Sequence, residues 1–141
     1  MSTRLTVLTL SLCLLSCKDE TTTGLPSDPL ARWESFNLHN YTIDQTASCF
    51  CPTGGSKMLV TVRSDTVFSV LRLSDNTTLT FAEAQLYHSI DELFETIQTI
   101  SDSIVVRYND AYGYPEYLDI DPAGHPVDAG VLYETTNLQI Q

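Results

Sequence analysis

The sequence has few basic residues and no long apolar run. Lysine and arginine together number 7 against 18 acidic residues, and the net charge is −11. Such an excess of negative charge argues against nucleic acid and anionic lipid headgroups as partners. The longest apolar run falls short of the roughly 20 residues that a membrane-spanning helix requires. Any attachment of this 141-residue chain to a membrane must therefore come from another feature.

Signatures of common catalytic and metal sites are also missing. There is no G-x-S-x-G elbow to expose a nucleophilic serine, and no C-x-x-C or H-x-x-H pair with the spacing of zinc ligands. The histidines His39, His88 and His125 are scattered, so we expect them at surface or loop positions. We therefore expect a protein that is not an enzyme and has no cofactor and no metal site.

A short apolar run at the N-terminus ends in a cysteine. Arg4 precedes the apolar residues 5–12, and the small Ser16 stands directly before Cys17. This order is typical of a secretory signal that is removed after export. The Leu-x-small-Cys pattern resembles the lipobox of bacterial lipoproteins. The resemblance implies a diacylglycerol on the Cys17 thiol, cleavage before that residue and acylation of the new amine, which together give stable membrane attachment.

The same pattern divides the chain and predicts its location. Residues 1–16 are expected to be the signal peptide, and residues 17–28, which are polar and threonine-rich, a flexible tether. Residues 29–141 are expected to form a single domain. Lys18 follows the cysteine, and by resemblance to enterobacterial sorting the absence of aspartate there favours the outer membrane. We expect a lipid-anchored protein of the bacterial cell envelope that faces the periplasm or the surface.

Hydrophobic periodicity predicts an α+β fold for the domain. Asp28 can cap a short helix with Pro29 at its first position, and residues 89–92 match the S-x-x-E capping box. Alternating apolar residues predict strands, and residues 78–88 are expected to hold a short helical turn. The predicted elements are helix 29–37, strands 41–49, 58–63 and 67–73, helix 89–100, and strands 104–108, 116–120 and 131–140. Short connections without βαβ crossovers favour a mostly antiparallel sheet of about six strands with two helices on one face.

Cys49 and Cys51 are the best candidates for chemistry. On a regular strand their side chains share a face with Cα atoms about 6.6 Å apart, near the upper limit for a disulfide. A bend at Pro52 and the glycines that follow would allow the bridge to close. We expect a local disulfide in a small ring, of a kind that is more easily reduced than most structural disulfides. A redox-active pair, free thiols and ligation of a soft metal stay open as alternatives.

Two loop patterns resemble binding motifs but favour structural roles. Asp119-x-Asp121-x-x-Gly124-x-x-x-Asp128 has part of a calcium loop, yet Ala123 and Gly130 occupy ligand positions. We expect Asp119 on the solvent face of a strand and Asp121 at its end. Residues 54–57 have two glycines and a lysine without the P-loop spacing, so a hairpin connection is the better interpretation.

A cluster of tyrosines surrounds one predicted turn. Its members are Tyr108, Tyr112, Tyr114 and Tyr117. Tyrosine is enriched at interfaces, so the cluster could form a recognition surface. We favour a turn packed by its own side chains.

Six fragments of the sequence together carry a family resemblance. They are Trp33, Tyr41-x-Ile43, Cys49-Phe50-Cys51-Pro52, Met58–Val62, Ser89-Ile90-Asp91-Glu92-Leu93-Phe94 and Gly113-Tyr114-Pro115. The set resembles a family of small bacterial lipoproteins and exported proteins known only as a domain of unknown function, over roughly residues 30–139. The turn at Ser64-Asp65 departs from the Asp-Gly expected there. The resemblance implies the fold and the location and brings no activity.

These observations lead to two functional expectations. The first is a membrane-anchored lipoprotein whose domain is a non-catalytic module for binding or envelope assembly, with an unknown protein or glycan as ligand. The alternative is a thiol-redox or soft-metal-handling lipoprotein that acts through Cys49 and Cys51.

Overall fold

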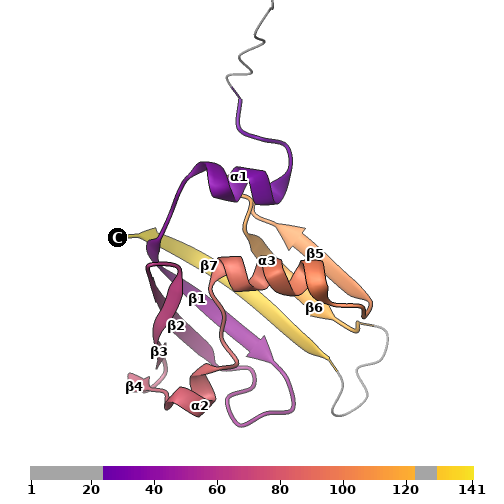
Figure 1. Ribbon diagram of the computed structural model, residues 1–141. Coiled ribbons are helices and arrows are strands. Elements are labelled where there is room, and N and C mark those ends of the chain that lie inside the picture. The colour runs from indigo at the N-terminus through magenta and orange to yellow at the C-terminus, as the bar shows by residue number, and fades with distance from the viewer. Residues whose placement is uncertain (1–23, 123–129) are drawn as a thin grey trace, which may run out of the picture.

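The computed structural model describes residues 24–122 and 130–141, which form one antiparallel sheet of seven strands with three helices (Figure 1). The elements are α1 (Pro29–Ser35), β1 (Asn40–Ser48), β2 (Lys57–Arg63), β3 (Thr66–Arg72), β4 (Thr77–Thr78), α2 (Phe81–Ala84), α3 (Ile90–Thr99), β5 (Ile104–Tyr108), β6 (Pro115–Ile120) and β7 (Val131–Ile140). The α+β class and the antiparallel sheet are confirmed. The predicted numbers of strands and helices were too low, because β4 is too short to produce a periodic pattern and because α2 was expected only as a helical turn within residues 78–88. The predicted signal peptide and Cys17 lie outside the described residues.

The strand order places the last strand in the middle of the sheet. The order is β4-β3-β2-β1-β7-β6-β5, and every pairing is antiparallel. Strand β7 therefore lies between β1 and β6 and joins the first half of the domain to the second. Figure 1 shows α3 across one face of this sheet and α1 at the end of the sheet where the β5–β6 turn lies. Within the described part of the chain, no helix has both the length and the apolar character needed to cross a bilayer.

The β2–β3 hairpin combines a confirmed turn with an unpredicted bulge. Ser64 and Asp65 both have positive φ, at 48° and 64°, as a type I′ turn requires. The register then shifts, because Thr61 pairs with Ser69 whereas Val62 pairs with Val67. The extra residue of this β-bulge reverses the side-chain alternation beyond it. Residues 67–73 therefore do not keep a single alternation along the strand, and the buried residue of β3 is Val70.

The core is organised around a buried tryptophan. Trp33 packs edge-on against Tyr41 and Tyr114, with ring centroids 5.4 and 6.4 Å apart, and its Nε1 donates to Asp91 Oδ1 at 2.9 Å. The Tyr41 hydroxyl accepts a hydrogen bond from the Ile90 N–H at 2.9 Å. Most fragments that carry the family resemblance thus meet at one place, where they fix α1, α3 and β1 relative to one another.

The tyrosines around residue 113 do not form a single surface. Tyr114 is buried against Trp33, Tyr112 packs on Phe36 at 4.8 Å, and Tyr108 stacks on Phe94 at 6.0 Å. Tyr117 lies on the other face of the sheet beneath the Arg107 guanidinium, 4.3 Å from its ring centroid.

The turn between β5 and β6 requires a glycine for packing reasons. Gly113 has φ of +84°, and a Cβ there would collide with the carbonyl oxygen of Pro29 in α1. Close approach of two backbones is a common reason for glycine at a fixed position. This turn therefore seats the first helix on the end of the sheet.

Candidate functional site

The two cysteines singled out in the sequence lie on the loop between β1 and β2. Cys49 and Cys51 are joined by a disulfide with their Cα atoms 5.3 Å apart, closer than on a regular strand. The loop closes as a hairpin connection, because the Gly55 N–H donates to the Ala47 carbonyl at 2.9 Å. A Cβ on Gly54 would collide with the carbonyl oxygen of Cys49. Both cysteines are partly exposed and Phe50 between them is 83% exposed, so this tip is accessible.

The histidines do not come together. His39 is exposed and its Nδ1 lies 2.9 Å from Asp65 Oδ1. His88 lies on the loop between α2 and α3, as expected, with its side chain 27% exposed, and His125 lies outside the described residues. Across residues 24–122 and 130–141, no group of three or more potential ligand side chains is placed to hold a metal ion.

The aspartates of the apparent calcium loop have separate environments. Asp119 faces away from the helices but is only 6% exposed, and the Tyr117 hydroxyl donates to its Oδ2 at 3.3 Å. The predicted solvent position was wrong because β6 has a strand on each side, which places Val105 and Leu132 beside Asp119. Asp121 follows the end of β6, as expected. Gly124 and Asp128 lie outside the described residues.

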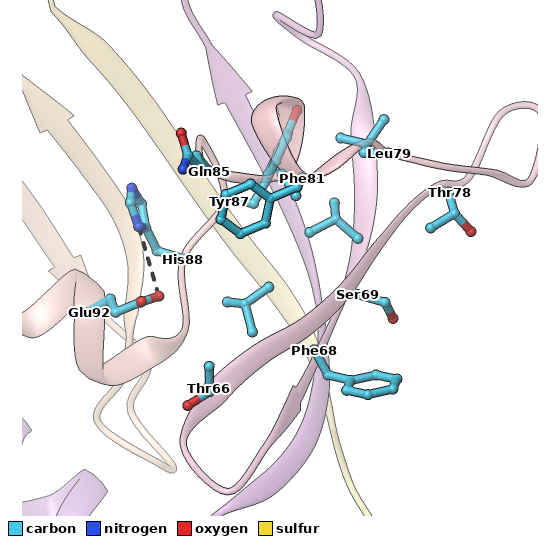
Figure 2. A pocket seen from close by; sticks show the side chains of 13 residues that line it. Thr66, Phe68, Ser69, Thr78, Leu79, Phe81, Gln85, Tyr87, His88 and Glu92 are labelled. Carbon is cyan, nitrogen blue, oxygen red and sulfur yellow. Dashed lines mark ion pairs between the residues drawn. The ribbon is translucent and has the colours of Figure 1, made fainter.

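A groove of about 500 Å³ lies between β3 and the segment that runs from β4 to the start of α3 (Figure 2). We call it the β3 groove. One wall is the continuous stretch Thr66–Val70 of β3. The opposite wall and floor are mostly apolar, and His88 and Glu92 provide a polar end. The remaining lining residues are Thr78, Leu79, Phe81, Ala84, Gln85 and Tyr87.

A short capped helix forms the outer wall of the groove. The Thr80 N–H donates to Glu83 Oε2 at 3.0 Å, and the Glu83 N–H donates to Thr80 Oγ1 at 3.4 Å, which completes a capping box. Helix α2 that begins there buries none of its residues, and Phe81 is 83% exposed. Sequence reasoning missed this helix boundary, although T-x-x-E at residues 80–83 is the same signal that located α3.

The groove floor is fixed by a buried amide. Gln45 accepts from the His88 N–H at 2.9 Å and donates through Nε2 to the His88 carbonyl at 3.1 Å. The same Nε2 lies 3.4 Å from Thr135 Oγ1. The neighbouring Tyr87 donates its hydroxyl proton to the Thr53 carbonyl at 3.3 Å, which links the floor to the cysteine loop.

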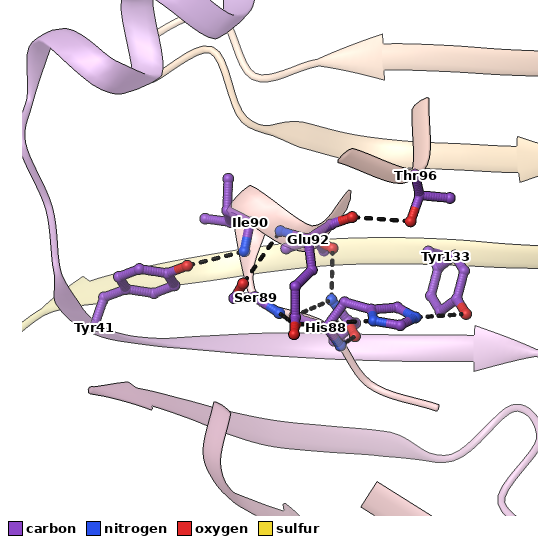
Figure 3. A network of polar contacts seen from close by, with 9 residues as sticks. Tyr41, His88, Ser89, Ile90, Glu92, Thr96 and Tyr133 are labelled. Carbon is purple, nitrogen blue, oxygen red and sulfur yellow. Dashed lines mark hydrogen bonds and ion pairs between the residues drawn. The ribbon is translucent and has the colours of Figure 1, made fainter. Parts of the chain in front are cut away.

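The polar end of the groove contains three interacting side chains (Figure 3). His88 Nε2 lies 3.2 Å from the Tyr133 hydroxyl, and His88 Nδ1 lies 3.9 Å from Glu92 Oε2. The same carboxylate oxygen accepts from the Ser89 N–H at 2.7 Å and so caps α3. Burial lowers the pKa of His88 although Glu92 acts in the opposite direction, and burial raises the pKa of Tyr133 to about 12.

These pKa shifts decide what the polar end can do. At neutral pH the imidazole is neutral and the Tyr133 hydroxyl keeps its proton, so the phenol is a poor nucleophile. The Glu92 side chain is 46% exposed, and its carboxylate faces no fully charged partner in the groove. The arrangement offers an apolar surface with one anionic end.

Comparison with known proteins places the chain in a family. A family model described as "Family of unknown function (DUF6174)" matches residues 27–140, nearly all of the described domain. No curated protein and no solved structure matches the chain. The family description includes neither an activity nor a metal, so it indicates no catalytic class. The chain belongs to DUF6174, a family of unknown function.

Proposed function

We propose that this protein is a lipid-anchored component of the bacterial cell envelope whose folded domain binds a protein or glycan in the β3 groove without catalysis. The observation that carries the binding role is the groove itself, with an apolar wall and the exposed Phe81 beside it. Large exposed aromatic side chains beside a concave apolar surface are typical of interaction sites.

The anchoring part of the proposal rests on the lipobox-like residues 14–17. The described chain begins within the tether that is predicted to follow this anchor. Arg32 Nε donates to the Pro26 carbonyl at 2.8 Å, and Asp28 accepts from the Ala31 N–H at 2.8 Å. The end of the predicted tether is thereby held against α1, at one end of the domain.

The absence of catalysis is supported by the bonding of the ionisable groups that line the groove. The His88 ring contacts Tyr133, whose pKa is raised, and Glu92 caps α3. General-base catalysis needs a base within reach of the proton that it removes from a substrate or water. His88 Nε2 and Glu92 Oε2 instead contact groups of the fold.

A metabolic label tests the anchor directly. Cells that express the full chain are grown with an alkyne palmitate analogue, and the protein is isolated and examined for label. We expect label on the wild-type protein and none on Cys17→Ser, which should also leave the membrane fraction or keep its signal peptide. Equal labelling of both proteins would overturn the anchor.

Site-specific crosslinking tests the groove. Replacement of Phe81 by p-benzoylphenylalanine places a photoreactive ketone at the rim, and the same replacement of Val105, which is exposed on β5, serves as the control. We expect a discrete crosslinked species in cells from position 81 and none from position 105. Absence of any species specific to position 81 would remove the groove as the binding site.

A second candidate is thiol chemistry at the cysteine loop, which the accessible disulfide favours. The bridge borders a depression of about 330 Å³ lined by residues 49–52, so an attacking thiolate can reach a sulfur atom. In such a step the thiolate forms a mixed disulfide with one sulfur and the other cysteine leaves as a thiolate. We test it by incubating the protein with reduced glutathione and following mixed-disulfide formation by intact mass. No exchange after hours at neutral pH would exclude this role.

A further inference from the structure

The outer edge of β3 is only partly paired. Strand β4 is the last strand of the sheet, and it pairs with β3 through Leu71 and Arg72 alone. One further bond, from the Leu79 N–H to the Val70 carbonyl at 2.9 Å, extends this pairing. Beyond it, no strand of the described chain lies beside Thr66–Ser69. An edge strand of this kind offers a row of backbone donors and acceptors to another chain.

The same stretch of β3 forms a wall of the groove. All five residues of Thr66–Val70 line it, and Figure 2 shows Tyr87 and Leu79 on one side of the strand with Phe68 pointing away on the other. The Arg63 guanidinium lies over the Phe68 ring at 4.2 Å and holds it there. Five residues of strand extend over roughly 17 Å, the length of a short peptide in extended form.

We infer that the β3 groove binds an extended polypeptide segment, which adds to the sheet beside Thr66–Ser69, places alternate apolar side chains in the groove and directs a lysine or arginine toward Glu92. This inference rests on the proposed binding function and names the class of ligand. Main-chain hydrogen bonds supply affinity in such strand addition, and pockets for alternate side chains supply specificity.

Other ligand classes satisfy the site less completely. A lipid tail would cover the apolar wall but leave the edge N–H and C=O groups without partners, which is costly once water is excluded. A glycan would place its hydroxyl groups against an apolar floor, which residues such as Leu79, Ala84 and Tyr87 form. An extended peptide satisfies both the edge and the floor.

Charge complementarity favours a ligand that has a basic residue near Glu92. Among the described residues that line the groove, Glu92 is the one carboxylate, and no lysine or arginine lines it. The chain as a whole carries a net charge of −11, which adds a longer-range attraction for cations. We therefore expect a basic segment to bind and an acidic segment of the same apolar pattern to be rejected.

The test uses the full chain in lipid nanodiscs and a library of fluorescein-labelled nonapeptides, with empty nanodiscs as the blank. Positions 3 and 5 carry Leu, Val or Phe, position 7 carries Lys or Glu, and the rest are Thr or Ser. Side chains two residues apart share a face of a strand. We expect saturable binding by fluorescence anisotropy, with the lysine peptides tighter by about threefold or more at low salt.

Backbone methylation distinguishes strand addition from side-chain docking. Each amide of the best peptide is N-methylated in turn. Because only every second N–H of an added strand faces its partner, we expect losses of about tenfold or more at alternate positions and little change between them. Uniform tolerance of methylation would overturn strand addition.

Two groove variants and one control locate the site. Glu92→Gln keeps the capping box, since glutamine also serves at that position, and removes the charge. It should abolish the preference for lysine over glutamate. Phe81→Ala should weaken binding of all the peptides, and Val105→Ala, on the edge strand β5 at the far side of the sheet, should leave binding unchanged.

The outcomes distinguish this inference from the proposed binding function on which it rests. Alternating sensitivity to methylation together with loss of the charge preference in Glu92→Gln supports strand addition. No binding by any peptide overturns it. In that case a position-81 crosslink to a glycan or to the folded surface of a protein would leave the binding function standing, and the absence of such a crosslink would overturn both proposals.

Discussion

Helices α2 and α3 begin in the same way but differ in how many of their residues are buried. Each opens with a capping box, Thr80 with Glu83 in one and Ser89 with Glu92 in the other. Helix α3 buries Ile90, Leu93 and Phe94, whereas α2 buries none of its residues. The cap therefore determines where a helix starts, and burial determines how strongly it is held. The weakly attached α2 and the start of the firmly held α3 both lie opposite β3 in the groove, as suits a surface that must admit a ligand.

The largest expected contrast comes from removing one apolar side chain from each helix. Leu93→Ala should lower the free energy of unfolding by about 2–5 kcal/mol, because it leaves a cavity in the core. Phe81→Ala should change it by about 0.5 kcal/mol or less, because the side chain is already in solvent. Urea denaturation followed by tryptophan fluorescence measures both. A comparable loss in the two variants would mean that α2 belongs to the core.

Next in size is the buried amide beneath the segment that connects the helices. Gln45→Leu removes both hydrogen bonds to the His88 backbone and leaves a buried N–H and a buried C=O without their partner. We expect a loss of about 2–3 kcal/mol, since an unsatisfied buried polar group is costly. Gln85→Leu, at an exposed position of the same groove, is the matched control and should cost far less. Equal denaturation midpoints for the two would show that the amide does not hold the groove floor.

Removing the caps should separate global from local stability. Ser89→Ala should cost about 1 kcal/mol of global stability because α3 unfolds with the core. Thr80→Ala should leave the denaturation midpoint nearly unchanged and raise amide exchange within α2 alone. Hydrogen exchange read by mass spectrometry distinguishes the two. Slow exchange in α2 after Thr80→Ala would contradict its weak attachment.

The smallest effect is a pH dependence at the polar end of the groove. Burial lowers the pKa of His88 in the folded protein below its ordinary value of about 6.5. The unfolded chain therefore binds more protons between the two pKa values, and stability falls as pH drops below about 6.5. Relative to His88→Gln, the wild-type protein should lose stability over this range. If the wild-type protein and His88→Gln lost stability in parallel from pH 8 to pH 5, His88 would not be the cause of the pH dependence.

The sequence located most of the elements because their signals are local. The S-x-x-E box placed the start of α3, and alternation placed β1 and β2. The turn at Ser64-Asp65 was found for the same reason. Each of these depends on neighbours within a few residues, which a single sequence displays.

The groove could not be predicted, because it depends on distant contacts. Its floor needs Gln45 to reach His88, 43 residues away, and the bulge at Phe68 exchanges which residues of β3 face the helices. A polar residue inside a strand does not indicate which distant group it will bond to. A one-residue bulge does not change the number of apolar residues in the strand, so the sequence does not reveal it. The cysteine pair was evident in the sequence, whereas the burial of Asp119 was not.

The central place of β7 has a consequence for the order in which the molecule is assembled. Tyr41 pairs with Ile140, so the middle of the sheet is closed by a contact between residues that lie far apart in the sequence. Until β7 takes its place, the β1–β3 meander and the β5–β6 hairpin have no common strand, and each small piece is marginal alone. The two halves of the sheet thus become one only when β7 docks, and a variant that lacks this strand would have two unjoined sheet fragments.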